Sequence, residues 1–361
     1  MTAAAVTPSI EVSGLNVSLL TPAKGEVRLV DDVSFAVRPG AMTAIVGESG
    51  AGKSLTTKAI LGLLDDRRFR VGGQVSLGGV DLSGMTARQR RAHVARTASL
   101  VFQNPTRALN PTMRVGPQII ESITKVRGTG PAGTGRTSKA QARERGLELM
   151  RAVGIPDPKE RFYSYPHQLS GGMRQRIVIA IALAADPKVI VCDEPTSSLD
   201  VTTQALIMDL FDQLRAERGI SFLLVTHDLA LASSRVDDVV VLYAGRVVEA
   251  NSADRIFRDA AMPYTRDLVA AIPDPADPAA LWQDRPPRHA APAPGGGCSY
   301  AANCAFAGQR CRDEVPALLP LDSDGQHGDG QHGGHLCRCW FPVAPSVSHG
   351  PLSAAAEQGG S

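Results

Sequence analysis

The N-terminal part of the chain alternates short apolar runs with turn residues, which is typical of β-strands. Within residues 10–46, the runs IEVSGLNVSLL and VRLVDDVSFAV are rich in β-branched residues, RPG marks a turn, and AMTAIV predicts a short buried strand. From Lys53 to Leu64 the pattern KSLTTKAILGLL predicts a helix instead. The chain is therefore expected to begin with strands and to change to a helix near residue 53.

Farther along, buried strands alternate with helices. Residues 112–165 have a mainly helical pattern, interrupted at 127–138 by a Gly/Ser/Thr-rich run for which we expect a surface loop. RIVIAIALAADP then predicts a buried helix, KVIVCDE a buried strand, QALIMDLFDQLRAERG an amphipathic helix, ISFLLVTHD another strand, and VDDVVVLYAGRVVEA a hairpin. This alternation predicts an α/β fold with a mainly parallel sheet.

The composition changes at about residue 272. Residues 273–297 are rich in Pro, Ala and Gly, which is typical of a semi-extended linker. Five of the six cysteines follow in a Cys-rich C-terminal region at 298–342, in which the pentapeptide DGQHG occurs at 324–328 and again at 329–333. The last residues, 343–361, are small and polar, and a disordered tail is expected there.

Composition and charge exclude several classes of protein. The chain is 43% hydrophobic and 20% charged with a net charge of +2, which is ordinary for a globular protein and gives no electrostatic case for nucleic acid as a partner. The N-terminus lacks the pattern of a signal peptide, and no run of about 18 apolar residues predicts a membrane span. A cytoplasmic location is therefore expected. There thiols stay reduced, so clustered cysteines favour metal or redox chemistry over disulfides.

The motif GESGAGKS at 47–54 matches the phosphate-binding pattern G-x-x-x-x-G-K-[ST], follows an apolar strand and opens a helix. Its glycines let backbone N–H groups surround a phosphate, the lysine reaches the β- and γ-phosphates, and the serine supplies an oxygen to Mg²⁺. The expected ATP-binding residues of this loop are Gly47, Glu48, Ser49, Gly50, Ala51, Gly52, Lys53 and Ser54.

A second motif, VIVCDEP at 189–195, is an apolar strand that ends in two carboxylates. Asp193 is placed to hold Mg²⁺, and Glu194 is the candidate general base for water. Cys192 beside them is interpreted as a small buried apolar residue. Together with the phosphate loop, this strand indicates a nucleoside triphosphatase.

Further motifs narrow the class. LSGGMRQR lies at 169–176, VFQNP contains Gln103, SSLD occupies 197–200, and Thr226-His227-Asp228 follows the next strand. In these motifs the chain resembles the ATP-binding subunits of ABC transporters over roughly residues 8–272. The resemblance implies an ABC-type P-loop NTPase fold, with a RecA-like core, an antiparallel β subdomain and a helical signature subdomain at about 106–175.

The resemblance also implies roles for these residues. Gln103 would be a catalytic residue that joins Ser54 and Asp193 at Mg²⁺ and senses the metal and the membrane partner. His227 would bond to the γ-phosphate and position the water of Glu194. Ser170, Gly171 and Gly172 precede a helix, so hydroxyl, N–H groups and helix dipole form an anion site. In the family that site faces ATP bound to the opposite subunit, which implies a second ATPase subunit, either another copy or a homologue.

One departure concerns the adenine. Family members usually place an aromatic residue ahead of the phosphate loop, but residues 1–34 contain no Phe, Tyr or Trp, and Phe35 has the pattern of a core residue. The stacking position falls near Lys24 to Arg28. We expect an aliphatic contact or a cation–π contact from Arg28 to replace stacking, which would hold adenine more weakly.

Two stretches favour one branch of the family. NPTRALNPTMRVGPQI at 104–119 resembles the SLNP…VGxQI run of oligopeptide and dipeptide importer ATPases, and MPYTRDLVAAIP at 262–273 resembles their HPYT…AIP element, with Met262 in place of His. The implied protein energises import of oligopeptides or dipeptides through two permease subunits supplied by an extracytoplasmic solute-binding protein, from the cytoplasmic face of the inner membrane. One alternative is import of nickel, metallophores or another small solute. Another is a non-transport ABC ATPase of DNA repair or of ribosomes, although such proteins carry two cassettes or long coiled coils.

The cysteine spacing supports the same branch. Cys298, Cys304, Cys311 and Cys339 give C-x5-C-x6-C-x27-C, while Cys337 stands where the branch usually has an apolar residue. Asn303 and Ala305 also depart from the usual Arg and Pro. Four thiolates can hold zinc or a [4Fe–4S] cluster. Because structural zinc usually uses tighter pairs, and because of the resemblance, the cluster is favoured over zinc or free thiols. The histidines at 327, 332 and 335 are interpreted as part of a duplicated Gly-rich loop.

Overall fold

The computed structural model describes residues 7–22, 25–128, 138–272, 296–321 and 335–343. The predicted linker and tail lie outside these residues, except for 296–297 and 343, and so do both DGQHG repeats with His327 and His332.

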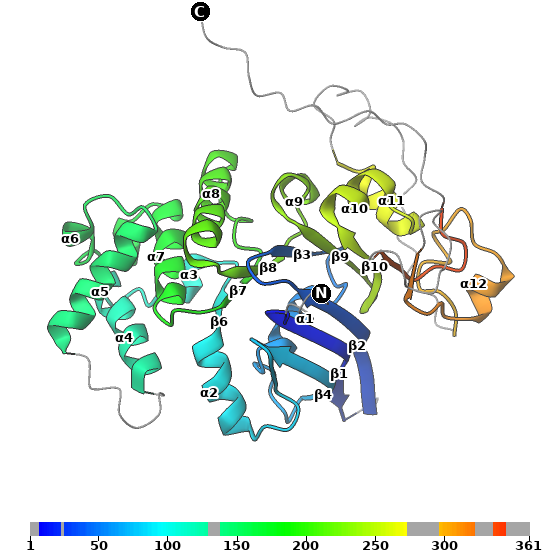
Figure 1. Cartoon of the computed structure of the whole chain (residues 1–361), viewed down its shortest axis with the longest axis horizontal. Coiled ribbons are helices and arrows are strands. Elements are labelled where there is room, and N and C mark those ends of the chain that lie inside the picture. Colours follow the sequence, from blue (N-terminus) through cyan, green and yellow to red (C-terminus); the bar gives the residue numbers. More distant parts are fainter. Residues whose placement is uncertain (1–6, 23–24, 129–137, 273–295, 322–334, 344–361) are drawn as a thin grey trace, which may run out of the picture.

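An eight-stranded sheet runs through the middle of the molecule (Figure 1) in the order β11-β12-β10-β9-β3-β8-β7-β6. The strands from β9 to β6 pair in parallel, and β10, β12 and β11 extend the sheet in antiparallel fashion. The prediction of an α/β fold with a mainly parallel sheet is therefore confirmed, and so is the hairpin of β9 and β10. The strands are β3 (Met42–Val46), β6 (Ala98–Val101), β7 (Val189–Asp193), β8 (Ser221–Val225), β9 (Asp238–Tyr243), β10 (Arg246–Ser252), β11 (Leu319–Pro320) and β12 (Leu336–Cys337).

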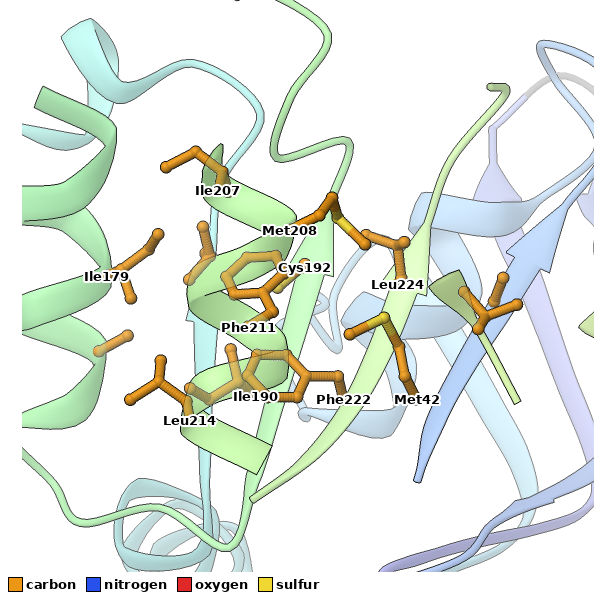
Figure 2. Packing of buried hydrophobic residues seen from close by; sticks show 14 of the residues in the cluster. Met42, Ile179, Ile190, Cys192, Ile207, Met208, Phe211, Leu214, Phe222 and Leu224 are labelled. Atoms are coloured by element: carbon orange, nitrogen blue, oxygen red, sulfur yellow. The ribbon is translucent and has the colours of Figure 1, made fainter. Parts of the chain in front are cut away.

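The parallel strands are buried on both faces. In β7, Ile190 and Cys192 belong to one hydrophobic core, and Val189 and Val191 belong to a second one. This alternation follows from the period of two in a strand, and the continuous apolar runs follow from burial on both sides. Figure 2 shows the first core, where strand residues such as Phe222 meet side chains of α8 (Val201–Arg218).

The second core lies beneath a separate antiparallel sheet in the order β2-β1-β4-β5. Its strands are β1 (Ile10–Thr21), β2 (Gly25–Val37), β4 (Phe69–Leu77) and β5 (Val80–Asp81). Phe35 on β2 is only 7% exposed and packs in this core, as predicted. The antiparallel sheet is therefore fixed to the face of the large sheet that also carries the first helix.

Helices cover the other side and the far end of the sheet. The group on the left of Figure 1 packs around buried residues such as Ile119, Leu147 and Ile177 in the first core. It consists of α3 (Pro105–Ala108), α4 (Val115–Gly128), α5 (Lys139–Ala152), α6 (Pro158–Arg161), a short 3₁₀ turn (Pro166–Gln168) and α7 (Gly171–Leu183). The remaining helices are α1 (Lys53–Ile60), α2 (Ala87–Thr97), α9 (Leu229–Arg235), α10 (Ala253–Asp259), α11 (Pro263–Val269) and α12 (Gln309–Asp313).

The predicted helix from Lys53 to Leu64 is too long, because α1 ends at Ile60. Gly62 adopts a left-handed φ of 63°, and Leu63 N–H donates to the carbonyl of Lys58. This is the geometry of a Schellman-type helix end, for which glycine is favoured. The apolar residues Leu63 and Leu64 thus continue the apolar pattern beyond the helix itself.

The C-terminal segment is joined to the edge of the large sheet. Cys337 on β12 pairs with Glu249 on β10, and the next residue, Arg338, is 6% exposed and donates to the carbonyl of Val247. Among the residues that the structure describes, no helix is both long enough and apolar enough to cross a membrane.

Candidate nucleotide-binding and hydrolysis site

The predicted phosphate loop connects β3 to α1 and requires its glycines. Gly47 has a φ of +147°, and a Cβ there would lie 2.2 Å from the carbonyl oxygen of Leu242. Gly52 caps α1 with a φ of +99°. The Lys53 ammonium donates to the carbonyls of Gly47 (2.7 Å) and Glu48 (2.9 Å). The loop is therefore a tight backbone cradle at the N-terminus of a helix, which suits an anion.

Lys53 lies in a mostly buried position between acidic groups. Burial lowers its pKa, while the carboxylates of Glu194, Asp193 and Glu48 act in the opposite direction. The ammonium is thus poorly hydrated and available to a phosphate, whose charge it can balance.

Two of the three predicted Mg²⁺ residues, Ser54 and Asp193, are in contact, and the third, Gln103, is bonded to Glu194 instead. Ser54 Oγ donates to Asp193 Oδ1 over 2.8 Å, which joins the start of α1 to the end of β7. A hydroxyl and a carboxylate oxygen are ligands that Mg²⁺ accepts, and so the pair fits this ion. Cys192 is fully buried, as predicted, and burial raises its thiol pKa far above the physiological range.

The predicted catalytic residues meet at the carboxyl ends of three neighbouring parallel strands. The Glu194 carboxylate accepts from Gln103 Nε2 at 2.7 Å and lies 3.2 Å from His227 Nδ1. These residues follow β7, β6 and β8 respectively. Glu194 has a left-handed φ of 48°, and its N–H donates to the carbonyl of Val225. Such backbone strain in a non-glycine residue fixes the direction of its carboxylate.

The signature residues lie apart from this cluster. The Ser170 hydroxyl accepts from Met173 N–H at the start of α7, and a Cβ on Gly172 would lie 2.7 Å from Thr203 Cγ2 on α8. Helix α7 packs in the first core and α1 in the second, on opposite faces of the sheet. Within this chain Ser170, Gly171 and Gly172 and the phosphate loop therefore begin helices that lie on opposite faces of the sheet.

The four predicted cysteine ligands line one pocket. Cys298, Cys304, Cys311 and Cys339 line one small pocket beside Met262 and Trp340. Burial raises the pKa of Cys298, and it raises that of Cys339 to about 12. In the described part of the chain, no three His, Cys, Asp or Glu side chains are arranged to hold a metal ion. A metal centre there is thus unsupported.

Cys337 is fully buried on β12, in keeping with the apolar residue usual at that position.

The position predicted to contact adenine lies on β2, and the structure shows what its side chains bind. Arg28 is already hydrogen-bonded to Asn16 and paired with Asp31 at 3.0 Å, so its guanidinium is engaged on the protein. The carbonyl of Leu29 lies near Gly52, and the Leu29 side chain is 38% exposed. The expected contact with the base, either aliphatic or from Arg28, stays a prediction, with the Arg28 guanidinium engaged on the protein and Leu29 partly exposed.

Two contacts near the site were not predicted from the sequence. Glu48 N–H donates to the hydroxyl of Tyr264, a residue of the MPYT run, over 3.1 Å. His335 Nε2 lies 2.7 Å from Glu249, a fully buried carboxylate on β10. The positions were visible as a branch motif and a histidine-rich stretch, but their partners are more than 80 residues away in the sequence.

Comparison with known proteins agrees with this geometry. The ABC transporter family matches residues 30–197, and the oligopeptide/dipeptide transporter C-terminal region matches residues 248–311. The chain is 42% identical over 321 residues to a Brucella abortus protein provisionally named a peptide import ATP-binding protein, covering 86% of this chain and 91% of that protein. It is 40% identical over 320 residues to the dipeptide transport ATP-binding protein DppD of Escherichia coli, covering 88% and 91%.

Solved structures support the same fold. A chain of the ABC transporter complex CbiONQ of Clostridium perfringens superposes with a TM-score of 0.58 at 25% identity, covering 70% of this chain and 91% of that one. The loop at 47–54, the carboxylates of Asp193 and Glu194, and His227 lie on this fold. The chain therefore belongs to the ABC transporter family, as an ATP-hydrolysing, ATP-binding subunit of its oligopeptide and dipeptide branch.

Proposed function

We propose that this chain hydrolyses ATP to energise import of oligopeptides or dipeptides through a separate membrane permease. The observation that carries the proposal is the joint presence of an assembled ATPase site and the C-terminal region of this branch at 248–311. Relatives at 40–42% identity are named for peptide import and dipeptide transport, which supports the substrate class. The partners would be two permease subunits and an extracytoplasmic solute-binding protein, with the chain peripheral to the inner membrane.

ATP would bind with its phosphates on the backbone N–H groups of the 47–54 loop. Lys53 would move from the carbonyls of Gly47 and Glu48 to the β- and γ-phosphates, because an ammonium pairs better with an anion than with neutral acceptors. Ser54 and Asp193 would hold Mg²⁺, with Gln103 nearby. The ion, when bound, would neutralise charge on the β- and γ-phosphates.

Hydrolysis would be carried out by Glu194, Gln103 and His227, which meet at the ends of β7, β6 and β8. Glu194 would accept a proton from the attacking water while the water oxygen bonds to the γ-phosphorus. The bond from that phosphorus to the bridging oxygen breaks, and ADP leaves with the electron pair. Gln103 holds one carboxylate oxygen of Glu194, and His227 lies at the other. His227 would also hydrogen-bond to the γ-phosphate.

We infer that a second ATPase subunit adds the signature residues to the site assembled in this chain. Ser170, Gly171 and Gly172 open α7, where a hydroxyl, N–H groups and the helix dipole favour an anion, but this chain's own phosphate loop lies on the other face of the sheet. We therefore propose that the signature residues contact ATP held by the partner, which would be a homologue or a second copy.

We also propose a [4Fe–4S] cluster on Cys298, Cys304, Cys311 and Cys339. Four thiolates bound to one zinc at about 2.3 Å would lie about 3.8 Å apart, whereas a cubane spaces its ligands more widely. The proposal is supported by the four cysteines lining one pocket and by the wide spacing of the cysteines in the sequence. Zinc and free thiols are the alternatives. The cluster would close a segment too small to fold alone.

The cluster is tested by anaerobic purification. We expect about four irons and four sulfides per chain, with loss of the visible absorbance when Cys304 is replaced by Ser. Zinc without iron, or thiols without either, would contradict the proposal.

The function is tested in vesicles that hold the cognate permease and binding protein. ATP should drive uptake of labelled di- and oligopeptides, and the Lys53→Ala variant should abolish uptake. Uptake of a nickel chelate or a metallophore without peptide uptake would reassign the solute. ATPase activity without uptake of any solute would favour a non-transport ATPase.

A further inference from the structure

The N-terminus of α11 stands between the phosphate loop and the cysteine pocket. Met262 and Pro263 line the pocket together with the four cysteines, and the next residue, Tyr264, receives the N–H of Glu48 in the phosphate loop. Only one peptide bond therefore separates the wall of the pocket from the residue that contacts the loop. In Figure 1, α11 lies close to the C-terminal segment that carries α12.

Tyr264 is held rigidly at this point. Its side chain is 1% exposed, and its ring packs against Tyr243 and Tyr300 with centroids 4.5 and 5.3 Å away. Tyr243 and Tyr300 also meet edge to face at 5.3 Å, so the three rings form a closed cluster. Such pairs are directional, which limits the positions that the Tyr264 hydroxyl can take.

Two of the supports of this cluster come from the stretch between the first two cysteines. The Tyr300 hydroxyl donates to Asp267, which lies on α11 one turn after Tyr264. Burial raises the pKa of the Tyr243 hydroxyl, and the nearby Asn303 side chain acts in the opposite direction. Asn303 is also one of the positions where this chain departs from its branch. The segment Cys298–Cys304 therefore contacts both the Tyr243 ring and the helix that carries Tyr264.

The start of α11 is fixed from the other side by a buried charge. Glu249 is fully buried and accepts from the N–H groups of Ala261 (2.6 Å) and Met262 (3.2 Å). His335 of the C-terminal segment lies against the same carboxylate. The C-terminal segment and the start of α11 are therefore joined through one buried carboxylate.

We propose that Tyr264 is a positioning residue for the phosphate loop, and that the segment Cys298–Cys304 holds Tyr264 in place. The arrangement of the residues that line the cysteine pocket would then set the affinity for ATP. The inference rests on the assignment of Glu48 to the ATP site. A bound or rearranged pocket would shift Met262 and Pro263, and with them the hydroxyl that orients the Glu48 amide. By linkage, ATP and the occupant of the pocket would then influence each other's binding equally.

The first test replaces Tyr264 with Phe in the full chain. Loss of one neutral hydrogen bond should raise the Kd for ATP roughly five- to ten-fold, with kcat at saturating ATP within about two-fold. Hydrogen exchange of the Glu48 amide should accelerate by a similar factor while the amides of β7 and β8 stay protected. The control, Tyr163→Phe, removes a hydroxyl that is bonded to Arg143 on the exposed helical side. Unchanged affinity and unchanged Glu48 exchange would overturn the positioning role.

The second test acts from the cysteine side. Asn303→Ala and Tyr300→Phe should each raise the Kd for ATP, although neither residue touches the phosphate loop. Combined with Tyr264→Phe, the effects should be smaller than their sum, because all three act through one contact. Full additivity, or no effect of Asn303→Ala, would overturn the link to the pocket. Lys53→Ala separates the hypotheses: if it leaves ATP binding intact, the site assignment fails rather than this inference.

Discussion

At the scale of single residues, the site depends on backbone conformations that place polar groups where local preference would not. Glu194 adopts a left-handed φ and is held by Gln103 and by the Val225 carbonyl. A carboxylate fixed in this way needs little reorganisation when it accepts a proton, which is the condition for an efficient general base.

Replacing Glu194 with Gln should reduce phosphate release about 10²- to 10⁴-fold, because the amide cannot accept the proton. The side chain keeps its size, so ATP should still bind and dimers should accumulate on gel filtration with ATP. Glu217→Gln, at the end of α8, is the matched control and should retain wild-type turnover. Unchanged phosphate release in the Glu194 variant would refute its assignment.

The missing aromatic residue ahead of the phosphate loop gives a second prediction at this scale. With Arg28 engaged by Asp31, the base would meet aliphatic side chains of β2, and we expect similar Kd values for ATP and GTP. Val27→Phe should tighten ATP binding several-fold by restoring a stacking surface. Val71→Phe, the same change on an exposed position of β4, should not. A strong preference of the wild type for ATP would contradict this view.

At the scale of elements, three residues of the functional motifs are also the N-caps of helices. Ser170, Asp200 and Asp228 each accept a backbone N–H three residues ahead, at the starts of α7, α8 and α9. Such caps satisfy donors that the first turn leaves unpaired. The same residues belong to the motifs at 169–176, 197–200 and 226–228, so local structure and function share one sequence signal.

The contact of α7 with α8 yields a prediction about stability. Ala at Gly172 would place its Cβ 2.7 Å from Thr203 Cγ2, and overpacking of this kind costs about 1–3 kcal/mol in the free energy of unfolding. Thr203→Ser should restore much of the loss, since it removes that methyl and keeps the hydroxyl bonded to Asp200. Gly171→Ala, whose Cβ meets Leu199 at 3.6 Å, is the matched control in the same helical turn. Urea unfolding would measure all of these, and equal losses at both glycines would contradict the steric explanation.

Much of this level could be predicted from the sequence. Apolar runs identified β3, β7, β8 and β9, and Glu194 and His227, which follow β7 and β8, meet because parallel strands end at one edge of the sheet. Strand β6, which positions Gln103, has only four residues and was not predicted. The end of α1 was missed, because the positive φ of Gly62 interrupts a pattern that remains apolar. The Tyr264 contact with Glu48 was missed for a different reason. It depends on packing between segments 216 residues apart, which no local pattern encodes.

At the scale of the whole molecule, the C-terminal segment ties the two ends of the chain together. Arg338 donates to the carbonyls of Val247 and Pro316 and to the carboxylate of Asp32, which lies 306 residues away on the antiparallel sheet. The guanidinium is nearly buried, and each of its bonds crosses between elements. The segment that carries the cysteines is thereby bonded both to the edge of the large sheet and to the antiparallel sheet.

Replacing Arg338 with Ala should therefore lower the free energy of unfolding by about 2–4 kcal/mol, because two buried carbonyls lose a charged donor at once. Arg310→Ala removes an exposed arginine that pairs with Glu314 one turn away and should cost less than about 1 kcal/mol. Urea unfolding of both variants gives the comparison. Since the same segment supports Tyr264, the Arg338 variant should also bind ATP more weakly while the Arg310 variant binds normally. Equal stability losses, or an Arg338 variant with normal ATP affinity, would mean that the segment is attached to the sheet without acting on the site.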